Sequence, residues 1–169
     1  SELVPRHIAF DRFCENLELL AHYSNDLGVK LLIENNVVTT ENLNKFDSNP
    51  FLCSEPLETL SVLTNLHGSV GLLLDVAHLK VSANSLQFDI LEAHSQLEPW
   101  IMGYHLSDND ALSDSNDLVS TDSWFWSCMN CTLDYYVLEV YTDSLISLSD
   151  QYSYTRNYVN SERKCCEDY

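Results

Sequence analysis

Apolar residues follow two different spacings along this chain, and the two spacings alternate. Between Phe10 and Ala21 they recur every three or four positions, which predicts an amphipathic helix that ends near Gly28. A short apolar run then follows at residues 29–35, and runs of this length and composition predict buried strands. The same alternation of strand and helix continues to the end of the chain.

The remaining elements are predicted in the same way. Predicted strands cover residues 29–35, 70–76, 100–106 and 135–141, and the predicted helices after them cover residues 54–68, 86–97 and 123–129 and begin again near residue 142. In the helix at 54–68, Ser54 is the predicted N-cap and Pro56 lies in the first turn. Apolar runs that alternate with helices are typical of an α/β fold whose strands are parallel and adjacent in chain order. A doubly wound sheet and a (β/α)8 barrel both fit this pattern.

Polar residues mark the point where each predicted strand ends. Glu34, Asp75, His105 and Glu139 each lie at or near the carboxyl end of their own apolar run. In a barrel these ends meet at one opening, where polar residues indicate chemistry because strand packing does not require them. A single acidic residue at a strand end is more often a helix cap or a loop acceptor, but four in register favour a shared site. Three carboxylates and one imidazole suit Mn²⁺, Mg²⁺, Co²⁺ or Zn²⁺.

Three further residues are candidates for contact with a substrate. His78 follows Asp75 by three positions, where it can reach the outer shell of a metal or a bound substrate. Asp108 has a comparable place after His105. Trp124 belongs to the segment DSWFW and is by default a packing aromatic, although it can also form the wall of a sugar pocket.

The cysteines offer a second, less favoured metal site. Two pairs, Cys128 with Cys131 and Cys165 with Cys166, have the number of thiolates that a structural zinc site needs. Adjacent cysteines are awkward joint ligands, however, and reduced thiols are ordinary in the cytosol. We therefore expect these cysteines not to bind zinc.

Charge and composition limit the partners. The chain has 8 basic and 26 acidic residues, and this net charge of −18 repels nucleic acid and anionic membranes. No apolar run approaches the roughly 20 residues that span a bilayer, and no signal peptide is recognisable, so a cytoplasmic location is expected. With 4 glycines in all, dinucleotide and phosphate-binding loops are excluded.

Four segments carry a resemblance to a known family. LLIENN, LLLDVAH, GYHLSDND and YVLEVY, in this order, resemble the last four strands of the xylose isomerase-like TIM-barrel superfamily, which includes sugar isomerases, sugar epimerases and DNA-repair enzymes of the endonuclease IV type. LDVAH and HLSDN are the most specific of these motifs. The resemblance implies that Glu34, Asp75, His105 and Glu139 bind one divalent metal and that His78 lies near the substrate.

The function that the resemblance implies is proton transfer next to the carbonyl of a small sugar or polyol, through an enediolate. Glu34 and Glu139 would be the catalytic pair, one removing the proton and the other returning it. The first alternative is a catalytically inactive barrel remnant that acts through metal binding or protein contacts. An endonuclease IV-like phosphodiesterase is disfavoured, because the loop after His105 contains Asp114 and Asp117 but no histidine.

The length of the chain predicts half of a barrel. We expect one domain over residues 1–153 and a C-terminal tail over residues 154–169. A complete barrel needs about 250 residues and eight strands, whereas this chain has 169 residues and four predicted strands. We expect a truncated or divergent product whose open strand edges are covered in a homodimer or by a missing N-terminal half.

Overall fold

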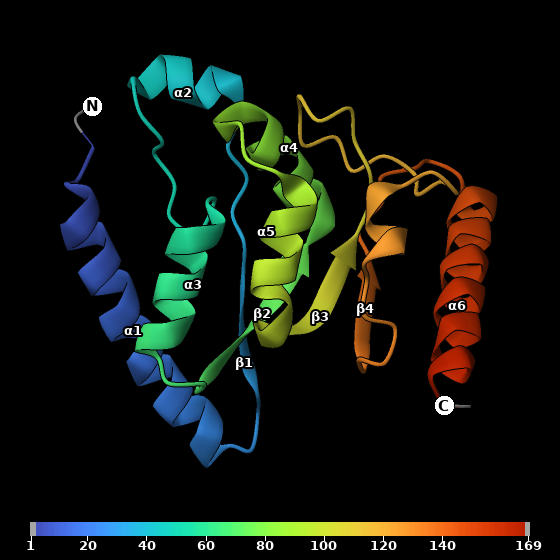
Figure 1. Ribbon diagram of the computed structural model, residues 1–169, viewed down its shortest axis with the longest axis horizontal. Helices are drawn as coiled ribbons and strands as arrows, with labels where there is room; N and C mark the ends of the chain where they lie inside the picture. Colours follow the sequence, from blue (N-terminus) through green and yellow to red (C-terminus); the bar gives the residue numbers. More distant parts are fainter. Residues whose placement is uncertain (1–2, 168–169) are drawn as a thin grey trace.

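The structure is a computed structural model that describes residues 3–167, with side chains described up to residue 164 (Figure 1). The strands are β1 (Leu31–Glu34), β2 (Val70–Asp75), β3 (Ile101–Leu106) and β4 (Tyr135–Leu138). The helices are α1 (Arg6–Asp26), α2 (Thr40–Phe46), α3 (Pro56–Asn65), α4 (Val76–Leu86), α5 (Ile90–Leu97) and α6 (Leu145–Glu167), with short 3₁₀ turns η1 (Glu98–Trp100) and η2 (Trp124–Ser127). Among the described residues, no helix is both long and apolar enough to cross a membrane.

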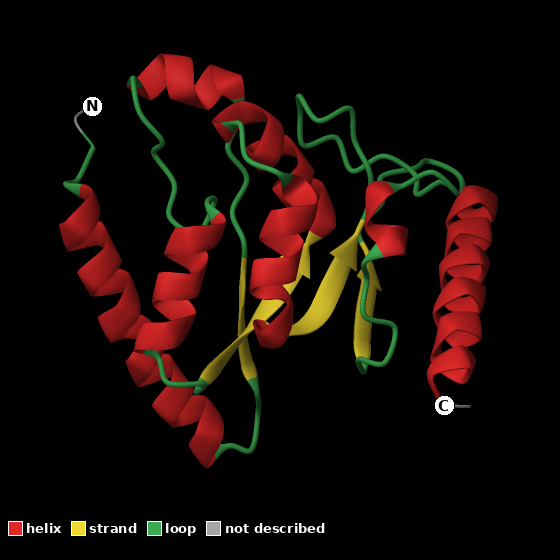
Figure 2. Ribbon diagram, viewed as in Figure 1, coloured by secondary structure: helices red, strands yellow, loops and turns green. Residues whose placement is uncertain are grey.

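The four strands form one sheet in the order β1-β2-β3-β4, and every neighbouring pair is parallel (Figure 2). This is the order predicted from the continuous apolar runs. Because the strands are parallel, their carboxyl ends lie along the same edge of the sheet. Asp75 of β2 pairs directly with His105 of β3 at this edge.

The two faces of the sheet differ in burial. On the face covered by the helices, Leu72, Leu74 and Tyr104 are fully buried. On the opposite face Tyr135 is 63% exposed and Val137 is 46% exposed, although both lie in a strand. The helices therefore cover one face, and the other face is open and apolar.

The helices differ from the prediction at several points. The helix predicted at 86–97 corresponds to α5, but a further helix, α4, was not predicted. It begins directly after β2, because the Asp75 side chain accepts a hydrogen bond from the His78 N–H and caps the helix. A second cap, Asp89, starts α5. The segment between the first predicted strand and the helix predicted at 54–68, for which no element was predicted, contains α2. Its first turn is closed by a reciprocal cap between Thr39 and Asn42.

Two smaller differences concern helix starts. The predicted N-cap Ser54 hydrogen-bonds to Asn49 instead, and Glu55 takes the N-cap position of α3. The short helix predicted at 123–129 is the 3₁₀ turn η2. Both errors shift an element boundary by a few residues and leave the order of elements unchanged.

The predicted boundary between domain and tail, after residue 153, falls inside α6. Tyr154, Tyr158 and Val159 of this helix pack against the core. The rings of Trp126 and Tyr158 are 4.2 Å apart, and the Tyr158 hydroxyl donates to the Trp126 carbonyl at 3.0 Å. Residues 154–164 therefore continue the packed outer layer beside η2.

Candidate metal centre

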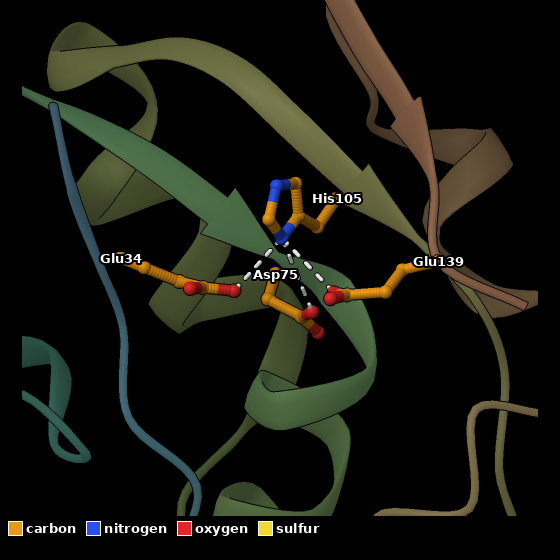
Figure 3. A group of neighbouring side chains, drawn as sticks. All are labelled: Glu34, Asp75, His105 and Glu139. Carbon is orange, nitrogen blue, oxygen red and sulfur yellow. Dashed lines mark hydrogen bonds and ion pairs between the residues drawn. The ribbon is translucent and has the colours of Figure 1, made fainter.

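Four side chains converge at the carboxyl edge of the sheet. Glu34 ends β1, Asp75 ends β2, His105 lies near the end of β3, and Glu139 directly follows β4. One oxygen or nitrogen atom of each lies within 4.8 Å of the corresponding atoms of the others (Figure 3). We call these four residues the cluster. Their convergence is what the register of the strand ends predicts.

The Nδ1 atom of His105 lies at the middle of the cluster. It is 2.9 Å from Glu34 Oε1, 3.0 Å from Glu139 Oε2 and 3.9 Å from Asp75 Oδ2. The two glutamates approach this nitrogen from opposite sides, as Figure 3 shows. Both glutamate side chains are 37% exposed, so their carboxylates are accessible from solvent.

The two carboxylate oxygens of Asp75 have different surroundings. The residue is fully buried. Its Oδ1 accepts the hydrogen bond that caps α4, at 2.7 Å from the His78 nitrogen. Its Oδ2 is buried and has no hydrogen-bond partner among the described residues. A buried anionic oxygen without a partner is costly unless a cation or a donor satisfies it, so this atom fits a metal ligand.

Burial and close contacts shift the pKa of Asp75, His105 and Glu34. Burial raises the pKa of Asp75 to about 6, because the carboxylate loses its hydration. The hydrogen bond between His105 and Glu34 raises the pKa of His105 and lowers that of Glu34. A protonated His105 thus partly balances three carboxylates, and a divalent cation would balance them more completely.

His78 lies beside the cluster, in the first turn of α4. Its Nδ1–H donates to the main-chain carbonyl of Asn35 at 2.9 Å. Its Nε2 is 3.4 Å from Asp114 Oδ2 and 3.9 Å from Asp75 Oδ2. Burial disfavours the charged imidazole, but the neighbouring carboxylates, Asp75 first, outweigh it and raise the pKa of His78.

Asp108 and Trp124 are bound by groups of the protein itself. Asp108 accepts hydrogen bonds from Lys80 Nζ and Ser123 Oγ, both at 2.6 Å. The indole N–H of Trp124 donates to the Val76 carbonyl at 3.3 Å. The predicted contact of these two residues with a substrate stays a prediction.

The contacts of Asp108 lead to a test of stability. Burial alone would raise the pKa of Asp108, but the hydrogen bonds from Lys80 and Ser123 lower it below its ordinary value. We expect Asp108→Asn to reduce the free energy of unfolding at pH 7 by about 1–3 kcal/mol. Because the folded-state pKa is lowered, the difference from wild type should shrink as the pH falls below about 4. Urea unfolding at several pH values measures this difference in the free energy of unfolding, and Asp150→Asn, at an exposed position, is the control. If the difference between wild type and Asp108→Asn were as large at pH 3 as at pH 7, the stabilising role of the Asp108 carboxylate would be contradicted.

The sequence did not indicate a role for Asn35. Asp114 was considered only in the comparison with endonuclease IV-like enzymes, whose histidine is missing from this loop. Asn35 is buried and contacts both Asp75 and His78. The segment LLIENN contains this residue, but an asparagine after a strand is too common to indicate such a role. Of the alternative thiolate site, only Cys128 and Cys131 lie within the described side chains, and those of Cys165 and Cys166 lie outside them.

Comparison with known proteins places the fold. The sequence matches no protein-family model, and no curated protein sequence is significantly similar to it. A solved structure of a D-tagatose 3-epimerase-like protein matches with a TM-score of 0.69 and 16% identity, over 90% of this chain and 56% of that chain. The chain has the fold of half of a xylose isomerase-like TIM barrel. The predicted fold class, a partial barrel of four parallel strands that alternate with helices, is confirmed.

Two further structures match this half-barrel. The 3-keto-D-glucoside 4-epimerase YcjR from E. coli has a TM-score of 0.62 and 10% identity, over 93% of this chain and 57% of that chain. The probable 3-DHS dehydratase AsbF from Bacillus anthracis has a TM-score of 0.54 and 16% identity, over 92% of this chain and 55% of that chain. The half-barrel thus spans a little over half the length of each of these structures.

Proposed function

We propose that the cluster binds one divalent metal ion and that the protein acts as a sugar isomerase or epimerase. The observation that carries the proposal is the buried, unpartnered Oδ2 of Asp75, which faces three other donor groups from three other strands. The similar structures support the reaction class, since two of the three are named as epimerases or epimerase-like.

The donor set fits a hard or borderline cation. Three carboxylates and one imidazole nitrogen suit Mn²⁺, Mg²⁺, Co²⁺ or Zn²⁺. When bound, such an ion would supply Lewis-acid stabilisation of negative charge on substrate oxygens. Glu34, Asp75, His105 and Glu139 would hold it.

The proton transfer belongs to the two glutamates. Glu34 and Glu139 present carboxylate oxygens on opposite sides of the His105 nitrogen, and both are accessible. One would remove the proton from a carbon next to a carbonyl, and the other would return it. Return to the opposite face of the same carbon gives epimerisation, and return to the neighbouring carbon gives isomerisation. His78, held beside Glu34 and Asp75, is placed to contact a substrate hydroxyl.

A further set of strands would complete the site. The open face of the sheet exposes Met102, Tyr135 and Val137, and a hollow of about 720 Å³ lies against it. We propose that four more βα units, in the same or another polypeptide, complete the barrel and cover this face. A second copy of this chain would complete the barrel less well. Helix α1 lies beside β1 and α6 lies beside β4, at the two ends of the sheet (Figure 1). Wherever β1 of one copy met β4 of the other, two helices would therefore have to fit at that junction.

The test of the proposed reaction is deuterium incorporation from D₂O into a panel of unphosphorylated ketoses and aldoses. The groups that would transfer the proton, Glu34 and Glu139, are on this chain, whereas a specific product also depends on contacts from the rest of a barrel. We expect exchange with added Mn²⁺ and none after chelation. A folded, metal-loaded protein that exchanges no proton with any sugar would instead support the inactive remnant.

A further inference from the structure

One buried side chain joins the end of β1 to the end of β2. Asn35 directly follows β1 and is only 3% exposed. Its Nδ2 donates to the Asp75 carbonyl at 3.0 Å, and its Oδ1 accepts from the Asp75 N–H at 2.7 Å. Strand pairing between β1 and β2 extends only to Glu34 and Leu73. The carboxamide of Asn35 therefore takes the place of the main-chain partner that β1 no longer offers to Asp75.

These two hydrogen bonds determine where the Asp75 carboxylate lies. The Asp75 main chain is fixed on one side by its pairing with His105 and on the other by Asn35. With the main chain fixed and Oδ1 bound to the first turn of α4, Oδ2 is left facing the cluster, 3.9 Å from His105 Nδ1. The position of the unpartnered oxygen thus depends on Asn35, which has no atom in the cluster.

The same residue also orients His78. The main-chain carbonyl of Asn35 accepts the Nδ1–H of His78 at 2.9 Å. A carbonyl can only accept, so Nδ1 of His78 carries a proton, and this hydrogen bond fixes the orientation of the ring. The other ring nitrogen, Nε2, faces Asp114 Oδ2 at 3.4 Å.

We infer that Asn35 is the positioning residue of this site: it holds the Asp75 carboxylate in the metal-binding orientation and His78 beside it. This role rests on the proposed metal-binding function. Groups that orient a ligand from outside the coordination sphere typically change metal affinity by about 10–100-fold when removed. A residue that only stabilised the fold would change the stability without changing the affinity of the folded protein.

Asn109 provides a matched control. It is also a buried asparagine with two hydrogen bonds to main-chain groups, donating to the Ala77 carbonyl and accepting from the Ala111 N–H, both at 2.9 Å. Its partners are outside the cluster. Asn35→Ala and Asn109→Ala should therefore lower the melting temperature in the same direction, and only the first should weaken metal binding.

The experiment measures the Kd for Mn²⁺ from the electron paramagnetic resonance signal of the free ion, well below the melting temperature of every variant. We expect Kd to rise at least about tenfold in Asn35→Ala and to stay at the wild-type value in Asn109→Ala. Asn35→Ser, which keeps one hydroxyl near the Asp75 main chain, should give a smaller rise and provides the measurement if the alanine variant does not fold.

Two outcomes distinguish a failure of the positioning role of Asn35 from a failure of the proposed metal site. A folded wild-type protein that does not bind Mn²⁺ contradicts the proposed metal site, and the positioning role falls with it. Tight binding by wild type together with an unchanged Kd in the Asn35 variants overturns the positioning role alone.

Discussion

Replacement of Glu139 by glutamine is expected to slow the exchange of a substrate C–H proton with solvent by at least about 100-fold. The amide has nearly the shape of the carboxylate but cannot accept a proton. Glu139 lies at a partly exposed position just past β4, so the fold should be kept. The rate of deuterium incorporation, measured by mass spectrometry with saturating Mn²⁺, gives the result directly.

The control for this variant is Glu15→Gln, which makes the same chemical change at an exposed position on α1. It should exchange protons at the wild-type rate. If Glu139→Gln remained folded and metal-loaded and still exchanged protons as fast as wild type, Glu139 would not be a proton-transfer residue.

Replacement of Asp75 by asparagine is expected to weaken the binding of Mn²⁺ by at least about 100-fold, at the upper end of what loss of an orienting contact produces. The change removes the negative charge from a fully buried oxygen that has no other partner. Asparagine is itself a good N-cap, so α4 should still begin at the same residue. The metal-free variant should be at least as stable as wild type, because it no longer buries an uncompensated carboxylate.

Asp89→Asn is a matched control for this second variant. Asp89 caps α5 by accepting from the Glu92 N–H at 2.8 Å, just as Asp75 caps α4. The two substitutions therefore make the same change at the same helix position, and only one of them touches the cluster. Equal metal affinity in both variants would contradict the assignment of Asp75 as a ligand.

The strands and their shared edge could be predicted from the sequence, because both depend on local patterns. Each strand is a continuous apolar run, and an ionisable residue lies at or near the end of each run, where strand packing does not require one. Parallel pairing then places Asp75 opposite His105 without further information. The start of α4 could not be predicted, because a strand-end aspartate fits a metal ligand and a helix cap equally well. Here one oxygen of Asp75 caps the helix and the other faces the cluster.

The supporting residues could not be predicted, because their roles depend on contacts between distant segments. Asn35 and Asp75 are 40 positions apart in the sequence. They meet because the pairing of β1 with β2 ends at Glu34, which leaves the Asp75 main chain free to bond the Asn35 side chain. Likewise, Asp114 reaches His78 only because the loop after β3 folds back over the edge of the sheet. Neither residue type is distinctive at its position in the sequence.

The central claim is that one divalent cation binds between Glu34, Asp75, His105 and Glu139. Crystals grown with Mn²⁺ and measured at a wavelength where manganese scatters anomalously test it most directly. We predict one anomalous peak among these four side chains, with Asp75 Oδ2 and His105 Nδ1 among its ligands, and the loss of that peak in Asp75→Asn. A wild-type crystal with no peak at the cluster, or with its only strong peak elsewhere, would contradict the account.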